Sequence, residues 1–338
     1  MGFIDIQMIT TKQIRSKVKL LDSLINDYKK QIPPKKRDWR TYEEQLFVRT
    51  KQAIHFYDKY VIRAVNALKT INHIKMGRPE KLNIEQKVRI LLIQRLIEKS
   101  NREMSFMLLL FSSLNKIDVS YKTIERIYDD EKVFLVLNNM HILILQDKNI
   151  NNIDACGDAT GYVLSVKEHY ASIISKIKDK KSTKKQKIIF SFVLMDIRSR
   201  LYVVYGTSFK SEKDAYNQAM IMLKDKGINI NSIRLDRYYS TQSTVKNLSE
   251  VHKNIKFFLI PKTNVTIKGS LNWKHMLKEF LEDTQKYLGE YFKRNQSESG
   301  FSEDKRRLGW RIPQKLDTRV NTAYFGILTW HNLFWVGA

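Results

Sequence analysis

The sequence predicts a mixed α/β protein that begins with an all-helical part. Up to about residue 149, apolar residues recur every three or four positions, as they do on one face of a helix. After about residue 150, short runs rich in Ile, Val, Phe and Tyr alternate with helical stretches, which is typical of an α/β domain. The 338 residues, 43% of them apolar, suffice for two or three domains with a buried core. We therefore expect a helical region at 1–76, a helix-turn-helix-like region at 77–149 and an α/β domain at 150–338.

Two helices are expected in the first region, at 12–28 and 42–71, because Pro33 and Pro34 and the basic residues after them interrupt the apolar periodicity. In the second region we expect three short helices, at 84–99, 102–113 and 120–130. Three helices with short turns between them form either a helix-turn-helix or an ordinary small bundle.

The third short helix is the candidate recognition helix of this region. Ser120 is a natural N-cap, and Lys122 and Arg126 could reach base edges and phosphates from a helix in a major groove. The alternative is an ordinary amphipathic helix. Arg78, between Gly77 and Pro79, could enter a minor groove as a short arm, or could belong to a simple loop.

In the third region we expect strands at 153–158, 162–166, 188–196, 201–209, 232–236 and 257–260. The four residues from Ile197 to Arg200 connect the third and fourth strands as a hairpin. A helix over 211–226 should end at Gly227, which is a good C-cap residue. Asp236 closes the strand after that helix.

The net charge of the chain indicates which class of binding partner to expect. The chain has 60 Lys and Arg against 35 Asp and Glu, a formal charge of +25, which favours nucleic acid over an anionic membrane as partner. Seven lysines fall within 176–187, in a segment that is either a solvated loop or a phosphate-binding strap. The single cysteine, Cys156, excludes an intramolecular disulfide. No apolar run reaches the roughly 20 residues needed to span a bilayer, so we expect a soluble cytoplasmic protein.

The most informative residues lie between 291 and 305. At about 100° per residue, Tyr291, Arg294, Glu298 and Lys305 share one narrow face of a helix. A carboxylate among two cations and an aromatic ring suits a site that binds metal and phosphate together. On the same helix, Glu303 and Asp304 point away from Glu298.

The spacing of these four residues resembles the signature around the catalytic glutamate of insertion-sequence DDE transposases from bacteria and archaea. Upstream, the segment from Asp158 to Gly161 is similar to the one at their first catalytic aspartate, and the segment from Arg234 to Tyr239 resembles the one at their second. The resemblance covers roughly 150–335 and looks closest to archaeal members, where segments similar to His169-Tyr170, Ser240, 298–302 and 330–333 occur.

This resemblance implies an RNase H-like, retroviral integrase-like core in which Asp158, Asp236 and Glu298 are catalytic and hold two Mg²⁺ ions, with Mn²⁺ as a substitute. Phosphate and DNA contacts would come from a set of aromatic and basic residues: Tyr291, Arg294, Lys305, Arg237, Lys122, Arg126 and Arg78. The implied activity is hydrolysis and strand transfer at transposon ends by a homo-oligomer that binds terminal repeats and target DNA near a prokaryotic nucleoid. The alternatives are an inactive DNA-binding remnant and a repair or restriction nuclease.

Some choices stay open at this level. Asp154 precedes Asp158 by four residues and points to the same side of a strand, so spacing alone does not separate them. Histidines 169, 275 and 331 are possible metal ligands or ordinary core and surface residues, and Trp310 is a possible base-stacking platform. Only 61 residues separate Asp236 from Glu298, which leaves no room for the large strand-rich insertion that some members of the family carry there.

Overall fold

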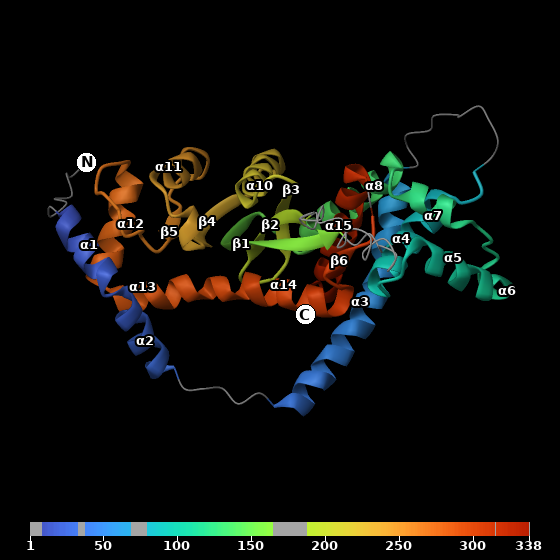
Figure 1. The fold of residues 1–338 in the computed structure, drawn as a ribbon, viewed down its shortest axis with the longest axis horizontal. Coiled ribbons are helices and arrows are strands. Elements are labelled where there is room, and N and C mark those ends of the chain that lie inside the picture. Colours follow the sequence, from blue (N-terminus) through green and yellow to red (C-terminus); the bar gives the residue numbers. More distant parts are fainter. Residues whose placement is uncertain (1–8, 33–37, 69–79, 165–187, 315, 338) are drawn as a thin grey trace, which may run out of the picture.

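The computed structural model describes residues 9–32, 38–68, 80–164, 188–314 and 316–337. In these ranges a central mixed sheet carries helices on both faces, and a bundle of helices stands at one end of the sheet (Figure 1). Several sequence expectations lie outside the described residues: Arg78, His169-Tyr170, the turn at Pro33-Pro34 and the whole lysine-rich segment.

The first three helices pack at opposite ends of the molecule. Helices α1 (Thr11–Lys19) and α2 (Leu21–Gln31) contact α12 (Leu271–Glu282) and α13 (Thr284–Tyr291). Helix α3 (Trp39–Leu68) packs instead on α8 (Glu131–Asp147) and α15 (Asp317–Trp335). The expected single helix at 12–28 is wrong, because α1 ends at Leu20, whose N–H bonds to Lys17 and Val18 instead of continuing the regular ladder.

The helical bundle follows the expected order with shorter elements: α4 (Ile84–Leu96), α5 (Asn101–Leu110), α6 (Ser112–Asn115) and α7 (Tyr121–Ile127). Caps set where α4, α5 and α7 begin. The side chains of Asn83, Ser100 and Ser120 each accept the N–H of the residue three positions on. The Ser120 cap is therefore confirmed.

The sheet order is β3-β2-β1-β4-β5, and a short sixth strand pairs with the far end of β1. The strands are β1 (Asn152–Leu164), β2 (Ile188–Asp196), β3 (Tyr202–Ser208), β4 (Asn229–Leu235), β5 (Lys256–Phe258) and β6 (Arg311–Ile312). Strands β1, β2 and β3 are antiparallel neighbours, whereas β4, β5 and β6 run parallel to their partners. The predicted hairpin of β2 and β3 is confirmed.

Strand β1 corrects one expectation. The segments 153–158 and 162–166 were expected to be two strands, but they belong to one strand that ends at Leu164. Gly157 and Gly161 pair directly with Leu194 and Phe190 of β2, so the glycines continue the ladder instead of turning the chain.

Helices cover both faces of the sheet. Helix α10 (Glu212–Lys226) is capped by Ser211 and ends at Gly227 at φ 63°, as expected. It packs on β2 and β3. Helix α11 (Gln242–Val251) lies on the same side in Figure 1. Opposite them, α13, a 3-10 turn η2 (Phe292–Arg294) and α14 (Asn295–Leu308) run as one long rod under the sheet (Figure 1).

Helix α15 joins the bundle to the sheet. Almost every residue from Val320 to Phe334 is buried, and the helix contacts α3, α4, α8 and β3. The indole N–H of Trp330 donates to the Leu92 carbonyl at 2.7 Å. Because such a helix has no polar face, its sequence lacks the helical alternation of polar and apolar residues from which a helix is predicted. In the described ranges, no helix is both long and apolar enough to cross a membrane.

Candidate active site

The sheet register brings two of the three predicted carboxylates side by side. Gly157 of β1 pairs with Leu235, the last residue of β4. The next residues on the two chains are Asp158 and Asp236, and paired positions of parallel neighbours share a face. Asp236 also caps a 3-10 turn, η1 (Arg237–Tyr239), by accepting the Tyr238 N–H.

The third carboxylate comes from the rod beneath the sheet. Glu298, in the first turn of α14, forms an ion pair with Arg294 at 2.8 Å between Oε1 and Nη1. The Nη2 atom of the same guanidinium lies 3.7 Å from Oδ1 of Asp236. The Arg294 guanidinium also lies 5.3 Å from the ring of Tyr291. These contacts confirm that Tyr291, Arg294 and Glu298 share one face.

Electrostatics show that Asp158 belongs to the same group. Burial raises the pKa of the Asp158 carboxyl to about 6, and the charges of Glu298 and Asp236 raise it as well. The Ala159 N–H, which donates to Asp158 at 2.9 Å, and the charge of Arg294 act in the opposite direction. The mutual electrostatic influence of Asp158, Asp236, Glu298 and Arg294 indicates that the three carboxylates lie near one guanidinium group.

Asp158 and Glu298 line a cleft of about 650 Å³ between β1 and α14. Lys305 lies in the same cleft, where its Nζ donates to the Thr160 hydroxyl at 2.6 Å, and burial lowers its pKa. Trp310, 64% exposed, stands at the edge of the cleft. Two residues of the predicted helical face, Glu298 and Lys305, therefore line one cleft, with the Trp310 ring beside them.

The donor set of this site suits a hard divalent cation, since all three side chains offer carboxylate oxygens. In the part of the chain that the structure describes, however, no three His, Cys, Asp or Glu side chains are close enough together to hold a metal ion. Arg294 lies between Asp236 and Glu298 and supplies the positive charge there. Its Nε atom is buried and has no hydrogen-bond partner among the described residues.

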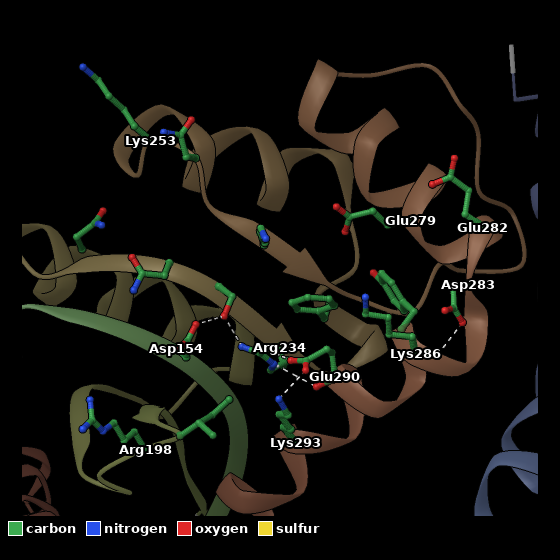
Figure 2. Close-up of a pocket in the computed structure, with 18 residues that line it drawn as sticks. Asp154, Arg198, Arg234, Lys253, Glu279, Glu282, Asp283, Lys286, Glu290 and Lys293 are labelled. Atoms are coloured by element: carbon green, nitrogen blue, oxygen red, sulfur yellow. Dashed lines mark hydrogen bonds and ion pairs between the residues drawn. The ribbon is translucent and has the colours of Figure 1, made fainter. Parts of the chain in front are cut away.

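Asp154 belongs to a different cavity, shown in Figure 2. There it accepts the hydroxyl of Ser232, whose oxygen accepts from Arg234 at 2.5 Å. Arg234 in turn pairs with Glu290 of α13, as the dashed lines in Figure 2 show. The structure thus separates the two aspartates that spacing alone left equivalent: Asp158 joins the carboxylate group, and Asp154 helps to fix a buried arginine.

The other predicted contact residues are spread over the molecule. Arg237 is half-buried in η1, directly after Asp236. Lys122 and Arg126 are exposed on α7 in the helical bundle, outside the cleft. His275 is exposed, and Trp273 and Trp330 are buried core residues.

A buried polar network behind α14 was not expected from the sequence. Asp304 lies 2.8 Å from Nδ1 of His331 and accepts the Tyr202 hydroxyl at 2.8 Å. The Nε2 atom of His331 lies 3.0 Å from the Arg200 carbonyl. Gly300 makes room for this packing, because a Cβ there would lie 2.8 Å from the Tyr202 hydroxyl. The expectation that Asp304 points away from Glu298 is confirmed, but its partners are far away in sequence.

The structure therefore defines a mixed α/β protein with a cleft beside β1 that both carboxylates and basic side chains line. The chain is similar to a protein of Archaeoglobus fulgidus named probable transposase for insertion sequence element ISA1214, with 37% identity over 326 residues, which covers 96% of both chains. The chain belongs to the family of insertion-sequence transposases. Searches found no matching family model and no matching solved structure.

Proposed function

We propose that this protein is a DNA transposase that binds the ends of its element and cuts and joins DNA strands with Asp158, Asp236 and Glu298. The observation that carries the proposal is that Arg294 contacts both Asp236 and Glu298, while Asp158 lines the same cleft as Glu298. The named relative supports it, because its similarity extends across the whole of the region that contains them.

The three carboxylates would hold two Mg²⁺ ions, or Mn²⁺ in their place, which would polarise the phosphodiester and lower the pKa of an attacking water or 3′-hydroxyl. Asp158 must be ionised for this role, and Arg294 favours its ionised form. Lys305 is placed to hold a phosphate oxygen at the cleft, since its ammonium already donates to Thr160 there. Trp310 would stack against a base that leaves the duplex near the cut.

Three finer assignments belong to the same proposal. The catalytic unit, 150–338, would be an RNase H-like core: carboxylates on neighbouring strands β1 and β4 face a helix packed on the sheet. The four-residue signature at Tyr291, Arg294, Glu298 and Lys305 would place the chain in the corresponding DDE group. Between Asp236 and Glu298, where every residue is described, the three-residue β5 is the sole strand, which agrees with the absence of a large insertion.

The helical regions 1–76 and 77–149 would supply DNA recognition. Helix α7 contacts α4 and α5, and its Glu125 and Asp129 pair with Arg319 of α15. This docking leaves Lys122 and Arg126 exposed, four residues apart on one face. A homo-oligomer would be needed to hold two transposon ends together.

The test is strand cleavage of a duplex that carries the terminal sequence of the element. The near-isosteric changes Asp158→Asn, Asp236→Asn and Glu298→Gln should each reduce Mg²⁺-dependent cleavage by at least about a hundredfold, because each removes a charged metal ligand. Binding to the same duplex should survive all three changes. Asp154→Asn, on the same strand, is the matched control and should cleave like the wild type.

Other results would point to the alternatives. Wild-type cleavage by any of the three variants would remove that residue from the site. DNA binding by the wild type without nicking under Mg²⁺ or Mn²⁺ would favour an inactive remnant, and cleavage without joining would favour a nuclease.

A further inference from the structure

A third cavity, of about 780 Å³, lies where α3, the β2–β3 turn, α14 and the end of α15 meet. Arg49, Arg200, Glu303 and Trp335 line it. The cavity shares no lining residue with the carboxylate cleft. It lies near the end of the chain marked C in Figure 1, where α14 and α3 approach each other.

Two guanidinium groups line this cavity, a third lies beside its lining residue Glu303, and each of the three lies over an aromatic ring. The guanidinium carbons of Arg49 and Arg200 lie 4.7 and 4.6 Å from the ring centre of Trp335. Arg307 lies 4.6 Å from the ring of Phe334. Stacking of this kind orients a planar guanidinium and leaves its N–H groups available at the edges.

The N–H groups of these arginines are largely unused. The side chains of Arg49 and Arg200 make no hydrogen bond or ion pair with the residues that the structure describes. Arg307 is only 14% exposed, yet both of its terminal nitrogens lack a hydrogen-bond partner within the described chain. Buried charged donors without acceptors are costly, so this arrangement favours an added acceptor.

The local charge is positive. Glu303 lies 3.3 Å from Arg307 and offsets one of the three cations. Glu44, at the rim, pairs with Arg40 of the same helix at 3.3 Å. Two guanidinium charges therefore remain without a counter-charge. Burial lowers the pKa of Arg307, the charge of Glu303 acts in the opposite direction, and the positive charge of Arg49 lowers the pKa further.

We propose that this arginine pocket binds a phosphate group of a DNA backbone at a point separate from the carboxylate cleft, an inference that rests on the proposed DNA-binding function. Forked guanidinium donors match phosphate oxygens, and two unmatched positive charges suit a phosphodiester in a flexible or bent strand. Nine residues separate Glu298 from Arg307, about two and a half helical turns, so the two sites lie on opposite sides of α14. A DNA that occupies both must pass around this helix.

The experiment measures duplex binding by fluorescence anisotropy over a series of salt concentrations. Arg49→Gln and Arg200→Gln should each weaken binding about tenfold or more and reduce the salt slope by about 0.9 for the lost phosphate contact. Arg49→Lys, which keeps the charge but not the fork, should bind with intermediate affinity. Lys51→Gln is the matched control: it removes one charge from the opposite, exposed face of α3 and should change binding little.

If all of these variants, including the control, lose the same small amount of DNA affinity, the arginine pocket is not a specific phosphate site. General electrostatic attraction would then explain the binding. If pyrophosphate stabilises the wild type but not Arg49→Gln, and Arg49→Gln binds DNA as tightly as the wild type, DNA is not the ligand of this pocket. If the wild type binds no DNA, both this proposal and the proposed function fail. Arginine-dependent binding without Mg²⁺-dependent cleavage would instead reject only the catalytic assignment.

Discussion

Arg294 and Glu298 form an ion pair at 2.8 Å one helical turn apart, and the same guanidinium lies 3.7 Å from Asp236. The arginine thus fills the space between two carboxylates that would otherwise repel each other. Its positive charge offsets the negative charges of both carboxylates.

Addition of Mg²⁺ should stabilise the folded protein, because a ligand that binds only the native state raises its stability by about 2.7 kcal/mol at a hundred times its dissociation constant. For a chain of this size the expected rise in Tm is about 5 °C. Differential scanning fluorimetry would measure it, with NaCl at equal ionic strength as the control. The rise should be absent in Asp158→Asn; an equal rise in that variant would contradict a metal site at this carboxyl.

The stability of the metal-free protein should fall as pH rises from about 4 to about 6. The pKa of Asp158 is about 6 in the folded state, whereas an unfolded aspartate titrates near 3.9. Between these values the folded state binds more protons, so stability is fully present below the lower pKa and is lost as pH passes through the higher one. Urea midpoints of the wild type and Asp158→Asn across this range would show it as a difference curve. Arg294→Gln should shift the loss to higher pH, because Arg294 lowers the pKa of Asp158.

Trp310→Ala should weaken binding of single-stranded DNA by about 1 to 3 kcal/mol, the usual loss of one base-stacking ring. The side chain is 64% exposed beside the cleft, so the fold should tolerate its removal. Trp310→Phe keeps an aromatic face and should restore most of the affinity. Affinities would be measured by titration with a labelled single strand, and unchanged binding by Trp310→Ala would show that this ring does not contact the DNA.

His331→Leu should destabilise the protein by about 3 to 5 kcal/mol, because it leaves the buried Asp304 carboxyl with only the neutral Tyr202 hydroxyl as partner among the described residues. Chemical denaturation would measure the loss. His275→Leu, on an exposed position of α12, is the control and should change stability by less than about 0.5 kcal/mol. Equal effects of the two changes would mean that the Asp304–His331 pair contributes nothing to stability.

Local signals in the sequence predicted a good part of this fold. Ser120 and Gly227 mark helix ends through their own backbone and side-chain chemistry, and both are confirmed. Long apolar helices could not be predicted in this way, because α15 is buried on all sides and shows no alternation of polar and apolar faces. The glycines of β1 were misleading, since glycine in a strand resembles glycine in a turn until the partner strand is known.

For the site, helical spacing predicted that Tyr291, Arg294 and Glu298 share a face, and the contacts of Arg294 agree. Spacing could not show that Arg294 also reaches Asp236, nor that Asp154 serves a separate cavity, because both depend on the register of β1 against β4. The pairing of Asp304 with His331 joins two helices and has no local signal.

The docking of α1 and α2 on α12 and α13 has a consequence for biosynthesis. Ile14 is fully buried, Arg15 donates to the Val265 carbonyl at 2.8 Å, and Tyr28 stacks on Phe292. Ribosomes make the amino-terminal helices first, so these helices wait for partners that emerge about 250 residues later, a loop closure that slows folding. A polypeptide whose translation stops early leaves the apolar sides of both helices uncovered, which makes it a substrate for cellular proteases.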